Sequence, residues 1–249
     1  MSGRLAGKVA IVTGASRGLG RRISELLVEE GACVGLVARA SDDLTAAAAA
    51  LGVRALALPA DLSDPEAVRA AFARVGEHFG GVDILVNNAA LGHPQKIAEA
   101  DDRLLQLEVA ANVLGPIYCI REATRSMRTR GGGDVVNISS ESVCAPYPYL
   151  SVYAATKSAL ETLSQGLREE LRADGIRVGV LRSGRLSESG FHRSWSPETR
   201  ERFRAEARAS GHDASSGEAI SPLITARAVL DMLCLPREAR LTMMELRPA

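Results

Sequence analysis

Short apolar runs alternate along the chain with longer segments in which apolar residues recur at helical spacing. The short runs are rich in Val, Ile and Leu, as is typical of buried strands, whereas the longer segments are typical of amphipathic helices. The pattern predicts strands at 8–13, 33–38, 54–60, 83–87, 134–139, 177–182 and 241–246. It predicts helices at 18–30, 41–51, 65–79, 99–130, 151–173 and 222–235.

This alternation of strand and helix predicts the fold class. Parallel strands joined by crossover helices form an α/β sheet with helices on both faces, and right-handed crossovers favour a doubly wound order. We therefore expect a single Rossmann-fold domain over residues 1–249, with a parallel sheet of about seven strands. Ligands of such sheets bind at the carboxyl ends of the strands.

The segment 187–221 fits neither a strand nor a core helix. It is polar and rich in arginine, yet it carries Phe191, Trp195 and Phe203. We interpret it as a lid over a substrate pocket.

Composition and charge narrow the class of protein. The 30 Lys and Arg residues balance 30 Asp and Glu residues, so no net field attracts nucleic acid or an anionic membrane. The cysteines form no CxxC pair, the chain has no apolar signal region before its first predicted strand, and no apolar run is long enough to span a bilayer. We expect a soluble, cytoplasmic protein without a metal site, and the many alanines and arginines favour a bacterial source.

A glycine-rich loop follows the first predicted strand and opens the first predicted helix. In this stretch, "TGASRGLG" at 13–20, Gly14 and Gly18 allow a sharp turn and close approach to a phosphate, and Gly20 allows the helix to pack on the strand. The placement between strand and helix predicts a dinucleotide site rather than a purely structural turn.

Two arginines bear on which dinucleotide binds. Arg39 ends the second strand, where a carboxylate would accept a free ribose 2′-hydroxyl, and Arg17 lies in the glycine loop beside it. Two guanidiniums suit a 2′-phosphate, which favours NADP(H) over NAD, although two solvated arginines are the alternative. Asp61, after the third strand, is expected to meet the adenine or to cap the next helix.

Tyr153 and Lys157 lie one helical turn apart and therefore on the same face. A nearby ammonium lowers the pKa of a phenol by favouring the phenolate, so the pair predicts a general acid tuned by a lysine. An ordinary contact on an amphipathic helix is the alternative.

Further motifs accompany the glycine loop and the tyrosine. They are "NNAA" at 87–90, Asn112 in "ANVLG", Ser140 at the end of "NISS", and "YAATK" at 153–157. With them the chain resembles the short-chain dehydrogenase/reductase family, in its short single-domain branch, over nearly its whole length. The resemblance implies a catalytic tetrad of Asn112, Ser140, Tyr153 and Lys157.

The resemblance also implies hydride transfer between a nicotinamide and a carbonyl or alcohol carbon. Ser140 would polarise the carbonyl oxygen, Tyr153 would protonate it, and Lys157 with Asn112 would relay protons. The implied cofactor contacts are Gly14, Ser16, Arg17, Gly18, Leu19, Gly20, Arg39, Asp61, Leu62, Asn88, Ala89, Tyr153, Lys157, Gly184 and Leu186. Family relatives pair two long helices into homodimers or homotetramers, and 99–130 and 151–173 are long enough for that.

The chain departs from the family pattern at three positions. Ala90 replaces a glycine, Ser183 replaces a proline and Glu188 replaces a threonine, which puts cofactor affinity in doubt. We also predict that Glu141 and Arg182 form an ion pair across the ends of neighbouring strands. Two independently solvated charges are the alternative.

The candidate substrate residues are aromatic or polar side chains of the loops and the lid. They are His93, Cys144, Tyr147, Tyr149, Phe191, His192 and Trp195. They favour an NADPH-dependent ketoreductase for a bulky aromatic or polyketide-type ketone of bacterial secondary metabolism. Packing of the loop by its tyrosines is an equal alternative.

Two other functions stay open. One is a 3-oxoacyl thioester reductase or hydroxy-acid dehydrogenase of primary metabolism, for which arginines of the lid would form a basic patch for an acyl carrier. The other is a non-catalytic, NADP-sensing binding protein.

Overall fold

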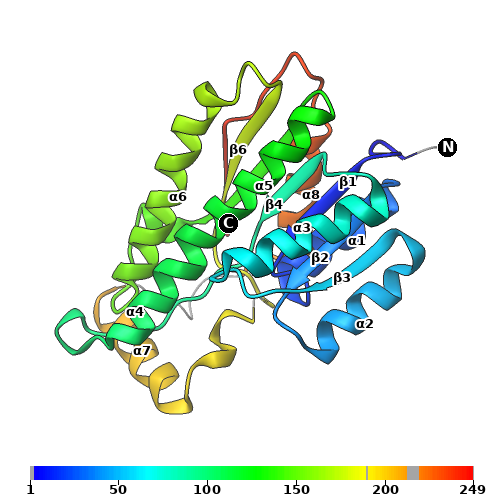
Figure 1. Cartoon of the computed structure of the whole chain (residues 1–249). Coiled ribbons are helices and arrows are strands. Elements are labelled where there is room, and N and C mark those ends of the chain that lie inside the picture. Colours follow the sequence, from blue (N-terminus) through cyan, green and yellow to red (C-terminus); the bar gives the residue numbers. More distant parts are fainter. Residues whose placement is uncertain (1–2, 189, 212–218, 249) are drawn as a thin grey trace.

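One parallel sheet runs through the molecule (Figure 1), whose computed structural model describes residues 3–188, 190–211 and 219–248. Its strands are β1 (Val9–Thr13), β2 (Cys33–Ala38), β3 (Ala55–Pro59), β4 (Ile84–Asn87), β5 (Gly133–Ser140), β6 (Ile176–Ser183) and β7 (Met243–Leu246). They lie in the order β3-β2-β1-β4-β5-β6-β7. The chain therefore reverses its direction across the sheet between β1 and β4. This confirms the predicted doubly wound Rossmann fold.

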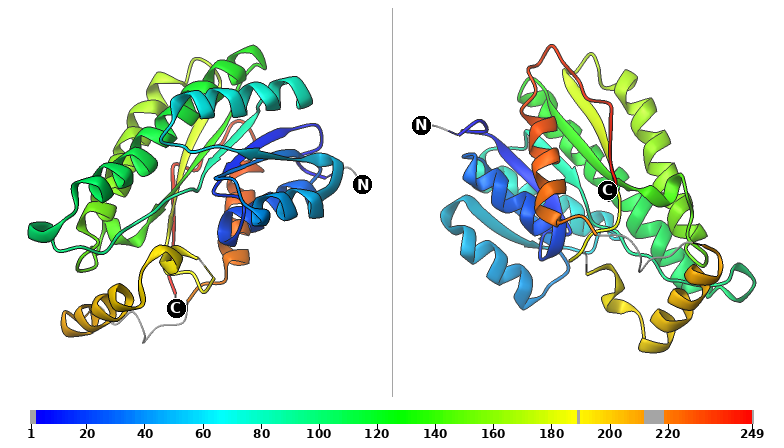
Figure 2. Two further views of the ribbon diagram at one scale, coloured as in Figure 1. Left: turned by 60° about the horizontal axis from the view of Figure 1, so that its bottom comes forward. Right: turned by 180° about the vertical axis from the view of Figure 1, so that it is seen from behind.

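Helices cover both faces of the sheet (Figure 2). One face carries α1 (Gly18–Glu29), α2 (Asp42–Leu51) and α8 (Pro222–Leu233). The other carries α3 (Pro65–Phe79), α5 (Gly115–Thr129) and α6 (Ser151–Glu170). Each helix buries its apolar stripe against Val, Ile and Leu side chains of the strands, which is why both faces of most strands are apolar.

The helix predicted at 99–130 is interrupted. Asp101 caps α4 (Asp102–Val109) by accepting the Leu104 N–H at 2.9 Å, and a π turn at Ala110–Leu114 separates α4 from α5. Pro116 lacks the N–H that would bond the carbonyl four residues earlier, so the α-helical ladder cannot run through this point. The other predicted boundaries differ from the structure by a few residues at most.

The segment interpreted as a lid contains a short 3-10 turn, η5 (Phe191–Ser194), and a helix, α7 (Pro197–Ala209). Ser196 caps α7 by accepting the Thr199 N–H at 3.0 Å, and Pro197 occupies the first turn. Trp195 and Phe203 pack with Leu150 in a cluster separate from the two core layers. Residues 189 and 212–218 of the segment lie outside the described residues.

Two further 3-10 turns, η2 (Ile97–Glu99) and η4 (Glu141–Val143), follow β4 and β5, and η1 (Gly52–Arg54) precedes β3. In the described ranges, no helix combines the length and the hydropathy needed to cross a membrane.

Candidate active site

A cavity of about 690 Å³ lies at the carboxyl ends of the strands, where the strand order reverses between β1 and β4. Loops after β1, β2 and β3 line one end, and the loops after β5 and β6 and the start of α6 line the other. The lid reaches both ends, because Phe191 packs on Tyr153 whereas Arg193 pairs with Asp43 at 3.6 Å. Both its size and its place are typical of a ligand site in a doubly wound sheet.

The glycine loop is fastened to the loop after β4. Gly14 has φ +65°, and a Cβ there would lie 2.9 Å from the Ala89 Cα. Asn88 donates from Nδ2 to the Thr13 carbonyl at 2.9 Å. Gly18, with φ +54°, and Gly20 do not line the cavity, and Gly20 packs against Gly14 and Asn88 instead. These two glycines shape the loop, whereas Gly14, Ser16, Arg17 and Leu19 face the cavity.

Arg17 and Arg39 line the same end of the cavity. Within the described residues, neither guanidinium forms a hydrogen bond or an ion pair, so both are available to an anionic ligand. Asp61 and Leu62 also line this end. Asp61 accepts from Ser63 N at 2.9 Å and Ser63 Oγ at 2.8 Å, whereas Asp64 caps α3. Asp61 is therefore not the helix cap.

Tyr153 and Lys157 both face the cavity from the start of α6. The Lys157 side chain is buried, its Nζ donates to the Ile138 carbonyl at 2.7 Å, and Nζ lies 5.9 Å from the centroid of the Tyr153 ring. Burial lowers the pKa of Lys157 to about 8, because the charged ammonium is desolvated.

The predicted lowering of the Tyr153 pKa is wrong for this structure. Burial raises the pKa of Tyr153 to about 12, which outweighs the opposite effect of a hydrogen bond to Ser140, and the nearby Glu108 and Glu141 add to the rise. Tyr153 therefore keeps its proton near neutral pH, as a general acid requires.

Ser140 ends β5 and lines the cavity. Its Oγ accepts from Ser142 Oγ at 3.0 Å and from Ser142 N at 3.2 Å. Because both bonds use lone pairs of Ser140, its own hydroxyl proton serves the hydrogen bond to Tyr153 and can be donated to a ligand oxygen that binds there.

Asn112 does not line the cavity but lies buried in the π turn. Its Oδ1 accepts the Leu91 N–H at 2.9 Å, and its Nδ2 donates to the Leu91 carbonyl at 2.7 Å and to Thr156 Oγ1 at 3.1 Å. Asn112 thus joins the loop after β4 to α6. The structure brings Ser140, Tyr153 and Lys157 together at one wall, with Asn112 behind them.

The profile of the family described as "short chain dehydrogenase" matches residues 8–199, most of the chain. The chain belongs to the short-chain dehydrogenase/reductase family. It is therefore an oxidoreductase, as the sequence motifs predict.

Several proteins resemble this chain in sequence as well as in fold. Sorbitol dehydrogenase of Cereibacter sphaeroides is 34% identical over 182 residues, which cover 73% of this chain and 71% of that protein. L-Sorbose reductase of Gluconobacter frateurii, solved with NADPH and L-sorbose, is 30% identical with a TM-score of 0.86, over 99% of this chain and 97% of that one. A metagenomic short-chain oxidoreductase solved with NADP is 26% identical with a TM-score of 0.81, over 99% of each chain.

The departures from the family pattern fit the local backbone. Ala90 lines the cavity without the positive φ that would require glycine. Ser183 ends β6, and its hydroxyl donates to the Gly184 carbonyl at 3.0 Å. Gly184 and Leu186 line the cavity, whereas Glu188 is exposed.

The predicted ion pair between Glu141 and Arg182 is wrong. Arg182 instead donates to Glu161 at 2.7 and 3.0 Å and to Glu245 at 3.0 Å. The reason is the register: Arg182 lies opposite Ser139, inside the strand pair, whereas Glu141 lies past the end of β5. Glu141 lines the cavity and accepts a hydrogen bond from the Tyr147 hydroxyl at 3.3 Å.

The candidate substrate residues divide into two groups. Tyr147, Phe191, His192 and Trp195 line the cavity, and Trp195 Nε1 donates to the Gly92 carbonyl at 2.7 Å. His93, Cys144 and Tyr149 do not line it.

The three residues outside the cavity lie on the surface or contact other side chains. Cys144 is exposed, and His93 lies against Glu108. Tyr149, at φ 65°, donates to Glu206 at 3.3 Å and stacks with Lys96 and Arg202, so it braces α7.

Sequence reasoning assigned Phe203 to the lid and Arg185 to a basic patch near its mouth, and both side chains line the cavity. It missed Glu108, which is buried behind the tetrad. The one available signal for Glu108 is its position one helical turn before Asn112, on the same face.

Proposed function

We propose that this protein is an NADPH-dependent ketoreductase. The observation that carries the proposal is that Ser140, Tyr153 and Lys157 meet at one cavity wall. Arg17 and Arg39, whose guanidiniums have no hydrogen bond or ion pair in the part of the chain that the structure describes, line the other, cofactor end. NADP or NADPH is bound in the solved structures of two relatives, which supports the same cofactor here.

The residues of the chain fit such a cofactor. Gly14, with its φ of +65°, turns the loop after β1 so that its backbone faces the cavity, and two guanidiniums suit a 2′-phosphate. When bound, NADPH supplies the hydride.

The protein's own residues bind and protonate the carbonyl. The Ser140 hydroxyl donates a hydrogen bond to the carbonyl oxygen, and Tyr153 gives that oxygen its proton. The buried Lys157, one turn from Tyr153, lies where its ammonium would stabilise the resulting phenolate. Asn112 holds the loop after β4 against α6, so that these groups keep their geometry.

The substrate end favours a bulky aromatic or polyketide-type ketone. The Trp195 and Phe203 rings pack at 5.2 Å, and the Tyr153 and Phe191 rings at 5.0 Å, which makes one wall aromatic. Flat apolar substrates bind well against such a wall.

A second candidate substrate is a polyhydroxylated ketone. Glu141 follows Ser140 directly and lines the cavity, where its carboxylate accepts a hydrogen bond from the Tyr147 hydroxyl. Its carboxylate would accept from hydroxyl groups next to the reacting carbonyl. The relatives named sorbitol dehydrogenase and L-sorbose reductase support this candidate.

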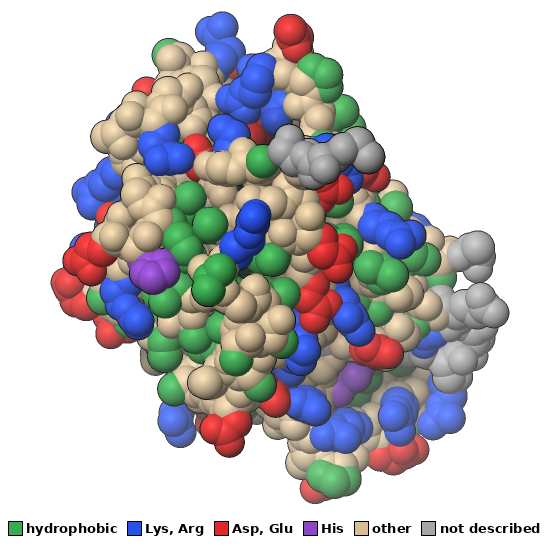
Figure 3. All heavy atoms as spheres, turned by 90° about the vertical axis from the view of Figure 1, so that its right-hand side faces the viewer, with side chains coloured by type: hydrophobic (Ala, Val, Ile, Leu, Met, Phe, Trp, Pro, Cys, Tyr) green, Lys and Arg blue, Asp and Glu red, His purple; other side chains and the backbone are tan. Residues whose placement is uncertain are grey.

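An acyl-carrier substrate is a weaker alternative. Lys and Arg side chains gather over the end of the molecule that holds α7 (Figure 3), where the sequence predicts a basic patch.

The site residues argue against a pure NADP sensor, because a sensor has no need of both Ser140 and Tyr153. A cytoplasmic location in a bacterial cell and a homodimeric or homotetrameric assembly belong to the same proposal.

NADPH oxidation by the purified protein tests this function. The ketone panel contains fused aromatic ketones, ketoses and 3-oxoacyl thioesters, and Tyr153→Phe is expected to lower kcat at least about a hundredfold by removing the general acid.

Arg39→Ser is expected to raise KM for NADPH about tenfold or more while changing KM for NADH little. Glu141→Gln separates the substrates: ketose turnover falls if Glu141 binds hydroxyl groups, while aromatic ketone turnover does not.

Turnover that survives in Tyr153→Phe would contradict the proposed chemistry. NADPH binding without turnover of any ketone would favour the sensor instead.

A further inference from the structure

A buried carboxylate lies behind the tetrad. Glu108 is on α4, and it is 1% exposed. Its Oε2 accepts the His93 backbone N–H at 3.4 Å and lies 4.0 Å from His93 Nδ1. Among the described residues, Glu108 Oε1 and His93 Nδ1 are buried without a hydrogen-bond partner. A buried carboxylate with one long hydrogen bond is costly for folding, so its presence calls for a functional reason.

The loop that Glu108 holds packs against the catalytic tyrosine. Gly92 precedes His93, and a Cβ on Gly92 would lie 3.2 Å from Tyr153 Cδ2. One turn after Glu108, Asn112 bonds to Thr156 of α6 at 3.1 Å. Glu108, the loop at 91–93 and the first turn of α6 therefore form one packed group.

The ionisable groups around Tyr153 come from three elements. Glu108 belongs to α4 and Glu141 to η4, and both disfavour the phenolate. Lys157 belongs to α6, the helix of Tyr153 itself, and its Nζ bonds to the Ile138 carbonyl. His93, in the loop after β4, faces Glu108, and its side chain is 17% exposed.

We propose that Glu108 is a positioning residue of the reductase, whose buried carboxylate keeps the proton on the Tyr153 hydroxyl. The proposal rests on the function proposed above, in which Tyr153 is the proton donor. It gives Glu108 of α4, which is not a member of the tetrad, an electrostatic effect on Tyr153.

The direction of the effect follows from the charges. Burial raises the pKa of Glu108 to about 7, so the carboxylate is negative above that pH. Burial lowers the pKa of His93, so the imidazole is neutral over the same range and does not offset the charge. A negative charge in a desolvated site raises the pKa of a neighbouring phenol. Tyr153 thus remains protonated to higher pH than it would without Glu108.

The test is a tyrosinate titration of the protein by ultraviolet difference absorbance, without cofactor or substrate. The chain has 4 tyrosines, and subtraction of the titration curve of the Tyr153→Phe variant leaves the signal of Tyr153 alone. Glu108→Gln keeps the size of the side chain but removes its charge, and is expected to lower the Tyr153 midpoint by roughly 0.5 to 1.5 pH units. The high-pH limb of kcat/KM for ketone reduction is expected to move in the same direction.

Matched variants separate charge from structure. Asp102→Asn removes a charge on the exposed first turn of α4 and is expected to leave the Tyr153 midpoint unchanged. Glu108→Asp keeps the charge and is expected to keep the midpoint of the wild-type protein. An unchanged midpoint in folded Glu108→Gln overturns the proposal.

If Glu108→Gln does not fold, His93→Arg decides. The added positive charge beside Glu108 is expected to lower the Tyr153 midpoint, and an unchanged midpoint overturns the proposal. Absence of turnover in the wild-type protein would contradict the proposed function, but the absorbance titration would still test Glu108.

Discussion

Lys157 shows how a functional residue can oppose stability. Its side chain is 2% exposed, and burial lowers its pKa to about 8 from the ordinary 10.5, so a charged lysine is held in the core near neutral pH. Between these two pKa values the unfolded chain binds more protons than the folded one, and stability therefore rises with pH.

We predict that Lys157→Met abolishes turnover yet unfolds with a higher free energy than wild type near neutral pH. The difference, on the order of 2 to 4 kcal/mol less the cost of the lost hydrogen bond to Ile138, is expected to shrink as pH rises from 8 to 10.5. Denaturant unfolding at several pH values measures it, with the exposed Lys8→Met as control. A difference that does not change with pH would refute the prediction.

Among single residues, sequence reasoning succeeded where a motif fixes chemistry to a position. Tyr153 and Lys157 face one cavity because a one-turn spacing determines a shared face. It was wrong about the direction of the Tyr153 pKa, because burial and the charges of Glu108 and Glu141 come from packing between distant segments. The partner of Arg182 depended on strand register, which the sequence does not display.

At the scale of elements, an ion-pair network fastens α6 to the sheet. Glu161 of α6 accepts from Arg182 of β6 at 2.7 Å and from Ser139 of β5 at 2.5 Å, and Arg182 also bonds to Glu245 of β7. Glu161 lies one helical turn after Lys157, so this network sets how the catalytic face of α6 meets the sheet.

Because Glu161 and Arg182 are largely buried, removing one of them leaves the other charge poorly paired. We predict that Glu161→Leu and Arg182→Leu each lower the free energy of unfolding by about 2 to 4 kcal/mol, and that the double variant loses clearly less than the sum. The exposed pair Arg172 and Glu169 provides the control: Arg172→Ala is expected to cost no more than about 0.5 kcal/mol. Additive losses in the double-mutant cycle would show that the two side chains act independently.

The elements themselves were largely predictable, with one informative exception. Strands and helices follow from hydrophobic spacing, and the predicted ranges 33–38 and 65–79 are the observed β2 and α3. The break between α4 and α5 was not predicted, although Pro116 marks it, because the apolar spacing continues through the π turn. The helix α7 packs outside the two core layers, in agreement with the prediction that the segment 187–221 contains no core helix.

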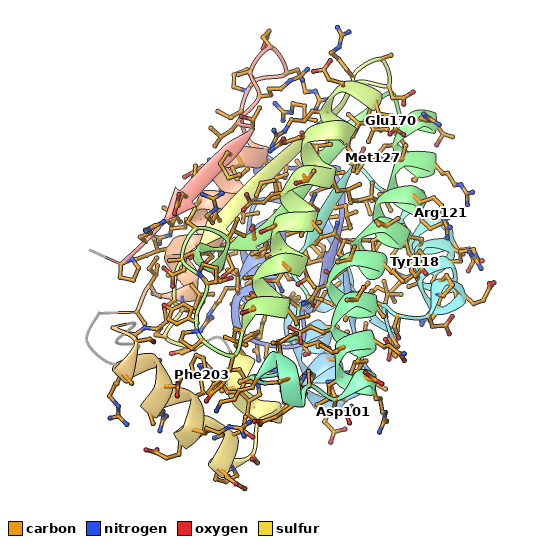
Figure 4. All side chains as sticks on the ribbon, turned by 90° about the vertical axis from the view of Figure 1, so that its left-hand side faces the viewer. Asp101, Tyr118, Arg121, Met127, Glu170 and Phe203 are labelled. Carbon is orange, nitrogen blue, oxygen red and sulfur yellow. The ribbon has the colours of Figure 1, made fainter. Side chains whose placement is uncertain are left out.

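At the scale of the whole molecule, apolar side chains remain exposed on the outer side of α4 and α5. Val109, Leu114 and Ile117 are 42%, 39% and 36% exposed, and Arg121 projects outward from α5 (Figure 4). Exposed apolar patches of this kind mark interaction surfaces, and the segment 99–130 that holds α4 and α5 is, with 151–173, expected to pair in a homodimer or homotetramer.

We predict that the wild-type protein sediments as a dimer or tetramer and that Ile117→Arg dissociates it, because a buried, unpaired guanidinium is costly in an apolar interface. Val53→Arg, at a side chain that is 92% exposed in η1 and far from this face in sequence, is expected to leave the assembly intact. Sedimentation velocity of the three proteins measures the outcome. The π turn that carries Asn112 joins the two helices of this face, so dissociation is also expected to lower kcat. A monomeric wild type, or an Ile117→Arg variant that stays assembled, would show that this face is not the interface.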